Sequence, residues 1–106
     1  MKYTLRQLKN IEKNKEFFKP NSKFNSYDVN VNEDKKHDKK IRDLFFEGRR
    51  MGCFMACRQT LRNGKVPDLA ILSSEELIVK EVMLSETDKR FNEKDYLGAK
   101  KIMVRI

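Results

Sequence analysis

Two short apolar segments separated by a polar turn constrain the fold of this chain more than any other feature. Residues 66–72 (VPDLAIL) and 77–84 (LIVKEVML) flank the sequence Ser-Ser-Glu-Glu at 73–76. Apolar runs rich in β-branched residues and split by such a turn predict two antiparallel strands joined as a β-hairpin. If the loop consists of those four residues, Leu72 lies opposite Leu77.

The same register places two acids, Asp68 and Glu81, opposite each other within an otherwise apolar hairpin. Facing residues of an antiparallel pair have Cβ atoms about 4.5–5.5 Å apart, and like charges at that distance destabilise a sheet. A bound cation, a shared proton or a nearby basic group would each offset the repulsion. We therefore take Asp68 and Glu81 as the centre of the candidate functional site.

A further strand is predicted at 53–61, ahead of the hairpin, because Asn63-Gly64 is a strong signal for a tight β-turn. A two-residue turn there places Gln59 opposite Asp68, so that Gln59 extends the row formed by the two acids. Pro67 lacks a backbone N–H and must occupy a non-bonded position or a bulge. A bulge would shift this register by one residue.

The remaining elements follow from apolar periodicity and capping residues. They are a helix over about 5–18 with a Thr4–Gln7 capping box, a polar loop at 20–36, a helix from about Asp34 to Met51, a helix from about 85 to 98, and a strand at 102–106. Because a helix precedes it, the last strand is predicted to lie parallel to 77–84. The order predicts an α/β (α+β) fold on a mixed sheet, with residues 1–34 preceding a core at 35–106.

The chain is strongly basic: Lys and Arg exceed Asp and Glu by eight among 106 residues, and the isoelectric point is about 9.6. An excess of this size in one small domain favours a polyanionic partner, most often nucleic acid. A soluble domain whose charge is incidental is the alternative. No segment approaches the roughly 20 apolar residues of a membrane span, and the N-terminus lacks a signal-peptide pattern. With only two cysteines, expected to be free thiols, these features predict a cytoplasmic protein without a membrane partner.

The predicted order of elements and its acids resemble the core of the PD-(D/E)xK nuclease-like superfamily. Val66-Pro67-Asp68 is similar to the "PD" of that superfamily, Glu81 to its strand acid, and Glu47 to the acid often supplied by the preceding helix. The resemblance implies a restriction-endonuclease-like αβββαβ core over about residues 35–106. The segments around His37-Asp38 and the two strand acids are also loosely similar to the nuclease-like domains of plasmid replication-relaxation and mobilisation proteins.

This resemblance implies a site in which Asp68, Glu81 and a backbone carbonyl hold Mg²⁺ or Mn²⁺, since hard cations prefer oxygen ligands. It also implies a lysine two positions after the strand acid, where this chain has Met83. The following helix offers Lys89, Arg90 and Lys94 as substitutes, and we take Lys94 as the catalytic one. The residues expected to contact nucleic acid are Arg58, Gln59, Arg62, Lys65, Lys89 and Arg90.

Three functions stay open from the sequence. Met83 favours a DNA-binding accessory factor of plasmid or phage DNA processing, which keeps the nuclease-like scaffold without its chemistry. The second is an active Mg²⁺-dependent DNA endonuclease. The third is a protein-binding module or inhibitor with no nucleic-acid role. A homodimer would bring two sites to a duplex, although no particular residue argues for one.

Overall fold

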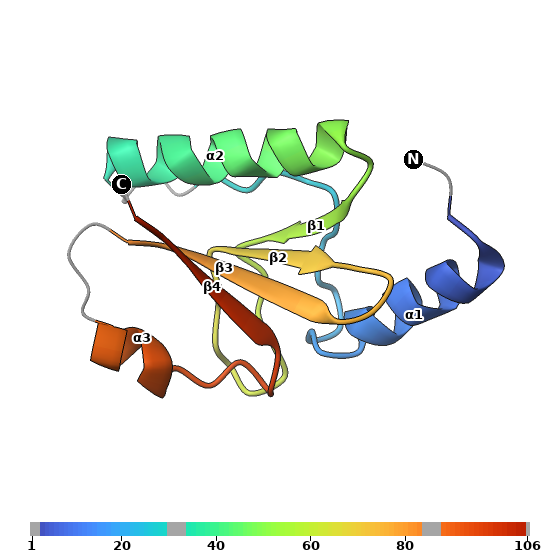
Figure 1. Cartoon of the computed structure of the whole chain (residues 1–106). Coiled ribbons are helices and arrows are strands. Elements are labelled where there is room, and N and C mark those ends of the chain that lie inside the picture. Colours follow the sequence, from blue (N-terminus) through green and yellow to red (C-terminus); the bar gives the residue numbers. More distant parts are fainter. Residues whose placement is uncertain (1–2, 30–33, 84–87, 106) are drawn as a thin grey trace.

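The computed structural model describes residues 3–29, 34–83 and 88–105, and for residues 88–90 it describes the backbone only. This part of the chain forms three layers (Figure 1). Helix α2 (Lys35–Arg50) covers one face of a four-stranded sheet, and helices α1 (Leu5–Lys15) and α3 (Asp88–Glu93) lie on the opposite side. The sheet therefore has its apolar residues covered on both faces.

The strand order across the sheet is β1-β2-β3-β4. The bounds are Phe54–Cys57 for β1, Leu69–Leu72 for β2, Leu77–Met83 for β3 and Lys100–Arg105 for β4. Strand β2 is antiparallel to both β1 and β3, whereas β4 runs parallel to β3. A mixed sheet in an α+β fold is thus confirmed, as is the pairing of Leu72 with Leu77 that the four-residue loop predicts.

Both long helices begin where their capping residues predict. Thr4 Oγ1 accepts the N–H of Gln7, and Gln7 Oε1 accepts the N–H of Thr4, which completes the capping box. Asp34 caps α2 through its side chain. Helix α1 ends at Lys15 rather than at 18. Phe18 instead forms an isolated antiparallel β-bridge with Leu61.

Two apolar cores, one on each face of the sheet, hold the layers together. The core under α2 consists of Ile41, Phe45, Met55, Cys57, Leu69 and Val82. The core on the α1 face consists of Ile11, Phe18, Ala56, Leu61, Ala70, Leu72, Leu77, Val79 and Tyr96. Residues of β2 and β3 alternate between these cores, as expected for strands covered on both faces.

The turn before β2 is longer than predicted. The N–H of Leu61 donates to the carbonyl of Lys65 at 2.8 Å, and the N–H of Gly64 donates to the carbonyl of Leu61 at 2.9 Å. Three residues rather than two therefore form the loop. Gly64 has φ = +86°, the left-handed conformation that such loops require at their last position.

The extra loop residue shifts the register between β1 and β2 by one. Cys57 pairs with Leu69, and the next residue, Arg58, donates its N–H to the carbonyl of Asp68 at 3.1 Å. The predicted pairing of Gln59 with Asp68 is therefore wrong. Strand β1 also ends at Cys57 instead of 61, since Arg58 adopts φ = +51° and leaves the extended conformation.

Replacing Gly64 with alanine is expected to lower the free energy of unfolding by about 1 kcal/mol, because a side chain is strained at this backbone conformation even though the space around the residue is open. Urea denaturation followed by circular dichroism measures the change. Gly64→Asn is the matched control and should lose less, since asparagine tolerates the left-handed region better. An alanine variant as stable as the parent would contradict the three-residue loop.

Candidate functional site

The missing N–H of Pro67 shapes the site. Continuing the observed register places Pro67 opposite Val82 of β3, and β2 begins only at Leu69. Pro67 cannot donate to the Val82 carbonyl, and two side chains bond this residue instead. Asp68 Oδ2 accepts the N–H of Val82 at 2.8 Å. His37 Nε2 lies 2.5 Å from the Val82 carbonyl oxygen and is the donor there, since a carbonyl only accepts.

Asp68 joins residues from two other elements. Its Oδ2 lies 3.4 Å from Nε2 of His37, in the first turn of α2, and its carboxyl is hydrogen-bonded to that of Glu81 on β3. The side chains of Asp68 and His37 are 17% and 14% exposed, so both lie at the boundary between core and solvent. The structure thus brings the two acids together, as the hairpin register predicts, and adds a histidine.

Burial controls the ionisation of Glu81. Glu81 is only 6% exposed, and the pKa of its carboxyl group is raised from 4.5 to about 8. The largest cause is lost hydration of the carboxylate, and the hydrogen bond and negative charge of Asp68 raise the pKa further. The Tyr96 hydroxyl, which donates to Glu81 Oε1, and the charge of Lys94 lower it. At neutral pH Glu81 therefore keeps its proton.

Lys94 and Tyr96 reach Glu81 from the segment between α3 and β4. Lys101 of β4 fastens this segment, because its ammonium group donates to three carbonyl oxygens at the end of α3. These belong to Phe91, Asn92 and Lys94, at 3.1, 3.0 and 2.8 Å. The contacts keep Lys94 within electrostatic range of Glu81.

Arg58 has a structural role in place of the predicted nucleic-acid contact. Its Nη2 lies 2.9 Å from Asp38 Oδ1, and its Nη1 donates to the carbonyl of Asp28. The Tyr27 hydroxyl donates to the same Asp38 oxygen at 2.6 Å, and this bond, followed by Arg58, lowers the pKa of Asp38. Because the Arg58 side chain is only 10% exposed, its charge is used within the protein. The network fastens the first turn of α2, and with it His37, to the end of β1.

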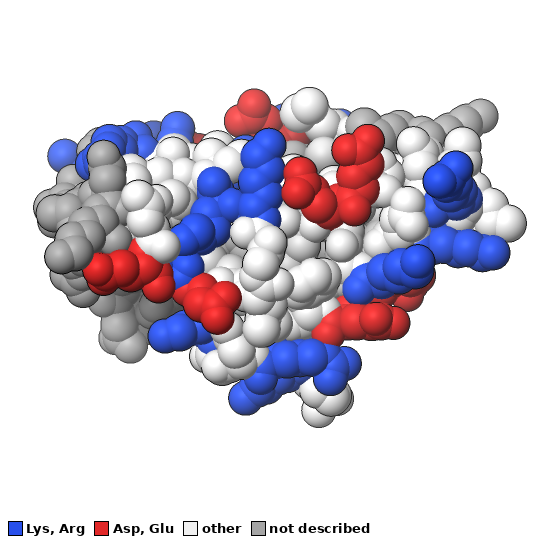
Figure 2. Space-filling view, turned by 60° about the horizontal axis from the view of Figure 1, so that its bottom comes forward, with Lys and Arg blue, Asp and Glu red and all other residues white. Residues whose placement is uncertain are grey.

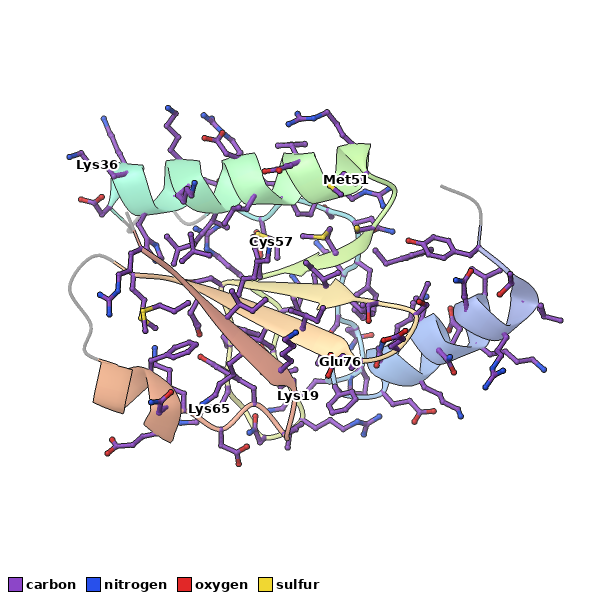
Figure 3. The ribbon with its side chains drawn as sticks, in the orientation of Figure 1. Lys19, Lys36, Met51, Cys57, Lys65 and Glu76 are labelled. Atoms are coloured by element: carbon purple, nitrogen blue, oxygen red, sulfur yellow. The ribbon has the colours of Figure 1, made fainter. Side chains whose placement is uncertain are left out.

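Gln59 is likewise occupied by the protein. Its amide donates to the carbonyl of Cys57 and accepts the N–H of Lys23, each at 2.8 Å. Lys65 is exposed and lies at the bottom of the molecule, away from α2 (Figure 3). The side chains of Lys89 and Arg90, also predicted to contact nucleic acid, lie outside the described residues.

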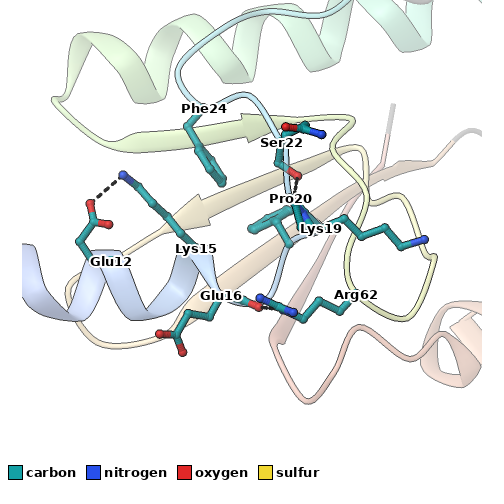
Figure 4. A pocket seen from close by; sticks show the side chains of 10 residues that line it. Glu12, Lys15, Glu16, Lys19, Pro20, Ser22, Phe24 and Arg62 are labelled. Carbon is teal, nitrogen blue, oxygen red and sulfur yellow. Dashed lines mark hydrogen bonds and ion pairs between the residues drawn. The ribbon is translucent and has the colours of Figure 1, made fainter.

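Arg62 lies at the rim of a cavity of about 420 Å³ between the end of α1 and the loop that follows it (Figure 4). Its Nε donates to the carbonyl of Glu16. Lys15 and Lys19 also line the cavity, but Lys15 is paired with Glu12 at 2.7 Å. The cavity therefore carries charges of both signs, and Arg62 is not part of a uniformly basic surface.

The structure does not bring Glu47 to the acidic pair. Glu47 follows His37 by ten residues in the same helix, which places it about 15 Å farther along the axis at a rise of about 1.5 Å per residue. There it lines a cavity of about 210 Å³ together with Met51 and Lys80. Lys36 and Met51 mark the two ends of α2 in Figure 3, and His37 belongs to the Lys36 end. Glu47, which the resemblance implies as a third acid of the site, is therefore separated from Asp68 and Glu81 along the axis of α2.

Sequence reasoning missed His37 and Tyr96 as members of the site. His37 is the only histidine in the chain, and a single histidine near the start of a predicted helix does not by itself indicate a ligand or a base. The available signal was Pro67, since a proline next to a strand leaves a carbonyl in need of a donor. Tyr96 gave no such signal, because an aromatic residue at the end of a helical pattern usually belongs to the core.

The positive charge is unevenly distributed. On the face that carries α1 and α3, basic and acidic side chains alternate and form no single patch (Figure 2). Helix α2 contains seven Lys and Arg and three Asp and Glu, a net of 7 − 3 = 4, which is half of the chain's net charge of +8. The helix that contributes His37 is therefore also the most basic element that the structure describes.

Among the described residues, no three His, Cys, Asp or Glu side chains converge closely enough to hold a metal ion by themselves. The acidic pair supplies two side chains, and the Val82 carbonyl lies beside them. None of the helices in the described part of the chain has the length and apolar character needed to cross a bilayer. Comparison with protein-family models, curated proteins and solved structures finds no match.

Proposed function

We propose that this chain is a DNA-processing protein on a PD-(D/E)xK nuclease-like scaffold, and that it is a metal-dependent nuclease. The observation that carries the proposal is the contact between Asp68, directly before β2, and Glu81 of β3, whose carboxyl groups are hydrogen-bonded to each other. A pair of acids in so apolar a hairpin is costly to keep without a cation to bind.

The arrangement of the elements supports the scaffold. From α2 onward the described chain runs helix, three antiparallel strands, helix and parallel strand. Asp68 lies directly before the second strand and Glu81 in the third, which is similar to the superfamily pattern. Helix α1 is an addition to this order, fastened to the turn between β2 and β3 by Asn10 and Asn14 through bonds of 2.8 and 2.6 Å.

The donor set fits a hard divalent cation. Asp68, Glu81 and the carbonyl of Val82 are all oxygen donors, the kind that Mg²⁺ and Mn²⁺ prefer. A bound ion would lower the pKa of a water molecule and offset the charge that develops on a phosphodiester. Asp68 is held in place by the N–H of Val82, and Glu81 by the hydroxyl of Tyr96.

Lys94 can supply the positive charge that is missing at Met83. In the superfamily a lysine follows the strand acid, and Met83 leaves that position without a charge. The charge of Lys94 acts on Glu81 from the segment after α3, which makes it a suitable group to hold a phosphate oxygen or the attacking water. The Lys-rich start of α2 next to His37 is suited to neighbouring phosphates, with Lys35, Lys36 and Lys39 exposed.

Incubation of supercoiled plasmid DNA with the protein and Mg²⁺ or Mn²⁺ tests the proposal. Wild-type protein is expected to nick or linearise the plasmid, and Asp68→Asn is expected to reduce cleavage by at least about a hundredfold, since it removes a charged ligand. The asparagine still accepts the N–H of Val82, so the variant should keep its fold. Binding of a fluorescent duplex at about 0.1 M salt, measured by anisotropy, should survive the substitution.

A second candidate function is kept because of Met83: a DNA-binding accessory factor without chemistry. Binding without cleavage under either ion, in wild type and variant alike, would establish that function and overturn the nuclease. Failure to retain either DNA or RNA at this salt concentration would overturn both and favour a protein-binding module.

A further inference from the structure

His37 stands between the two oxygens that the proposed function assigns to a metal ion. Its Nε2 is 2.5 Å from the carbonyl oxygen of Val82 and 3.4 Å from Asp68 Oδ2. The ring comes from α2, whereas both oxygens belong to the end of the hairpin. One nitrogen and two oxygens from three segments of the chain therefore lie close together near Glu81. Binding an ion must draw the side chains of His37, Asp68 and Glu81 closer, since they do not converge on one point by themselves.

We propose that His37 is itself a ligand, and that its presence makes the site prefer Mn²⁺ over Mg²⁺. The inference rests on the proposed function, since it concerns the ion held by Asp68 and Glu81. When the ion binds, the imidazole of His37 changes to the tautomer that carries its hydrogen on Nδ1: Nε2 gives its proton to the solvent, Nδ1 takes one up, and Nε2 forms the N–metal bond. The hydrogen bond to the Val82 carbonyl is lost, and that carbonyl becomes a ligand as well.

The separations are close to those of a coordination shell. Ligand bonds of about 2.0–2.2 Å at angles between 90° and the tetrahedral value place neighbouring donor atoms roughly 3.0–3.5 Å apart. The 3.4 Å between His37 and Asp68 already falls in this range. The 2.5 Å to the Val82 carbonyl must lengthen by about half an ångström, which a small rotation of the imidazole provides.

The mixed donor set is the basis of the preference. An all-oxygen shell suits Mg²⁺, whereas an imidazole nitrogen suits first-row transition ions, which accept nitrogen and oxygen together. The ring is also well held, because Arg58 and Tyr27 fasten the neighbouring Asp38. A ligand whose orientation is fixed in advance loses little freedom on binding the ion.

The wild-type protein provides a direct test, because it contains one histidine and the ring signals in an NMR spectrum need no assignment by mutation. Zn²⁺, a diamagnetic stand-in, is added to ¹⁵N-labelled protein at one fixed pH, and the two ring nitrogens are observed through their coupling to the ring protons. Ligation is expected to move Nε2 by far more than Nδ1. Unchanged ring signals at saturating ion would overturn the inference.

Calorimetric titration gives the selectivity. Wild-type protein is expected to bind Mn²⁺ at least about tenfold more tightly than Mg²⁺. His37→Gln is the matched variant, since its amide can still donate to the Val82 carbonyl but is a poor metal ligand. It should reduce Mn²⁺ affinity about tenfold and leave Mg²⁺ affinity within about threefold. An equal Mn²⁺-to-Mg²⁺ ratio in wild type and variant would assign His37 a hydrogen-bonding role only.

The two proposals can fail separately. If ions bind and Asp68→Asn abolishes the binding while the His37 signals do not respond, only the role of His37 is overturned. If neither ion binds to wild-type protein, the proposed metal-dependent function is overturned together with it.

Discussion

Metal-free protein is expected to lose roughly 3–5 kcal/mol of unfolding free energy between pH 5 and pH 8.5, because Glu81 must ionise in a buried site. Its pKa is about 8 in the folded protein and 4.5 when the group is freely hydrated. Below pH 4.5 the group is protonated in both states, and the folded state is favoured in full. As the pH rises, the unfolded chain ionises first, so stability falls until the folded carboxyl ionises as well near pH 8.

Glu81→Gln isolates this contribution. Glutamine has the same shape, carries no charge and can still bond Tyr96 and Asp68, so the stability of the variant should change little over the window. The variant is therefore expected to be more stable than the parent at pH 8.5 and inactive in cleavage. Urea unfolding in EDTA at half-unit pH intervals measures both curves.

Among the described residues, the other carboxyl group whose pKa is shifted, that of Asp38, does not produce the same trend. The pKa of Asp38 is lowered from 3.8 by Tyr27 and Arg58, so its contribution to stability is present above pH 4 and is lost on the acid side of the window. Parallel pH curves for wild type and Glu81→Gln would show that Glu81 does not carry its proton to high pH in the folded protein.

Lys94→Met is expected to lower the rate of DNA cleavage by roughly 10²–10³-fold, because it removes a cation whose charge acts on Glu81. The same substitution removes the charge that lowers the pKa of Glu81. The midpoint of the pH-dependent loss of stability should therefore move to higher pH. Gel assays of plasmid cleavage and the unfolding titrations described above measure the two effects.

Lys13→Met is the matched control, since Lys13 is an exposed lysine on α1, in a different layer from the acidic pair. It should leave cleavage within about threefold and the midpoint unchanged. Equal activity of Lys94→Met and wild type would mean that another cation supports the reaction.

Local sequence patterns accounted for the part of the site that lies within one hairpin. The four-residue turn between Leu72 and Leu77 determined the register, and the register alone placed Asp68 beside Glu81. Capping residues located the starts of α1 and α2 for the same reason: each depends on groups within a few residues of one another.

Contacts between distant segments could not be predicted in this way. The Asn-Gly signal predicts a two-residue loop, whereas Gly64 adopts φ = +86° in a loop of three residues. The extra residue shifts the register of β1 against β2 by one. His37 and Val82 are 45 positions apart in the sequence, and the apolar periodicity of a helix or strand does not predict a contact between such distant segments. The prediction for Glu47 was wrong because the resemblance assigns an acid to the helix without fixing how far along the axis it lies from Asp68 and Glu81.

The proline that ends the pairing of β2 has a consequence for how this molecule can change. Pro67→Ala would supply an amide hydrogen opposite Val82, so that the sheet could extend by one more bonded pair and release the imidazole of His37. Such a protein would no longer offer the Val82 carbonyl to the ion that we propose. Pairing of the two backbones and the proposed ligation would compete for this one oxygen, and Pro67, directly before β2, prevents the pairing.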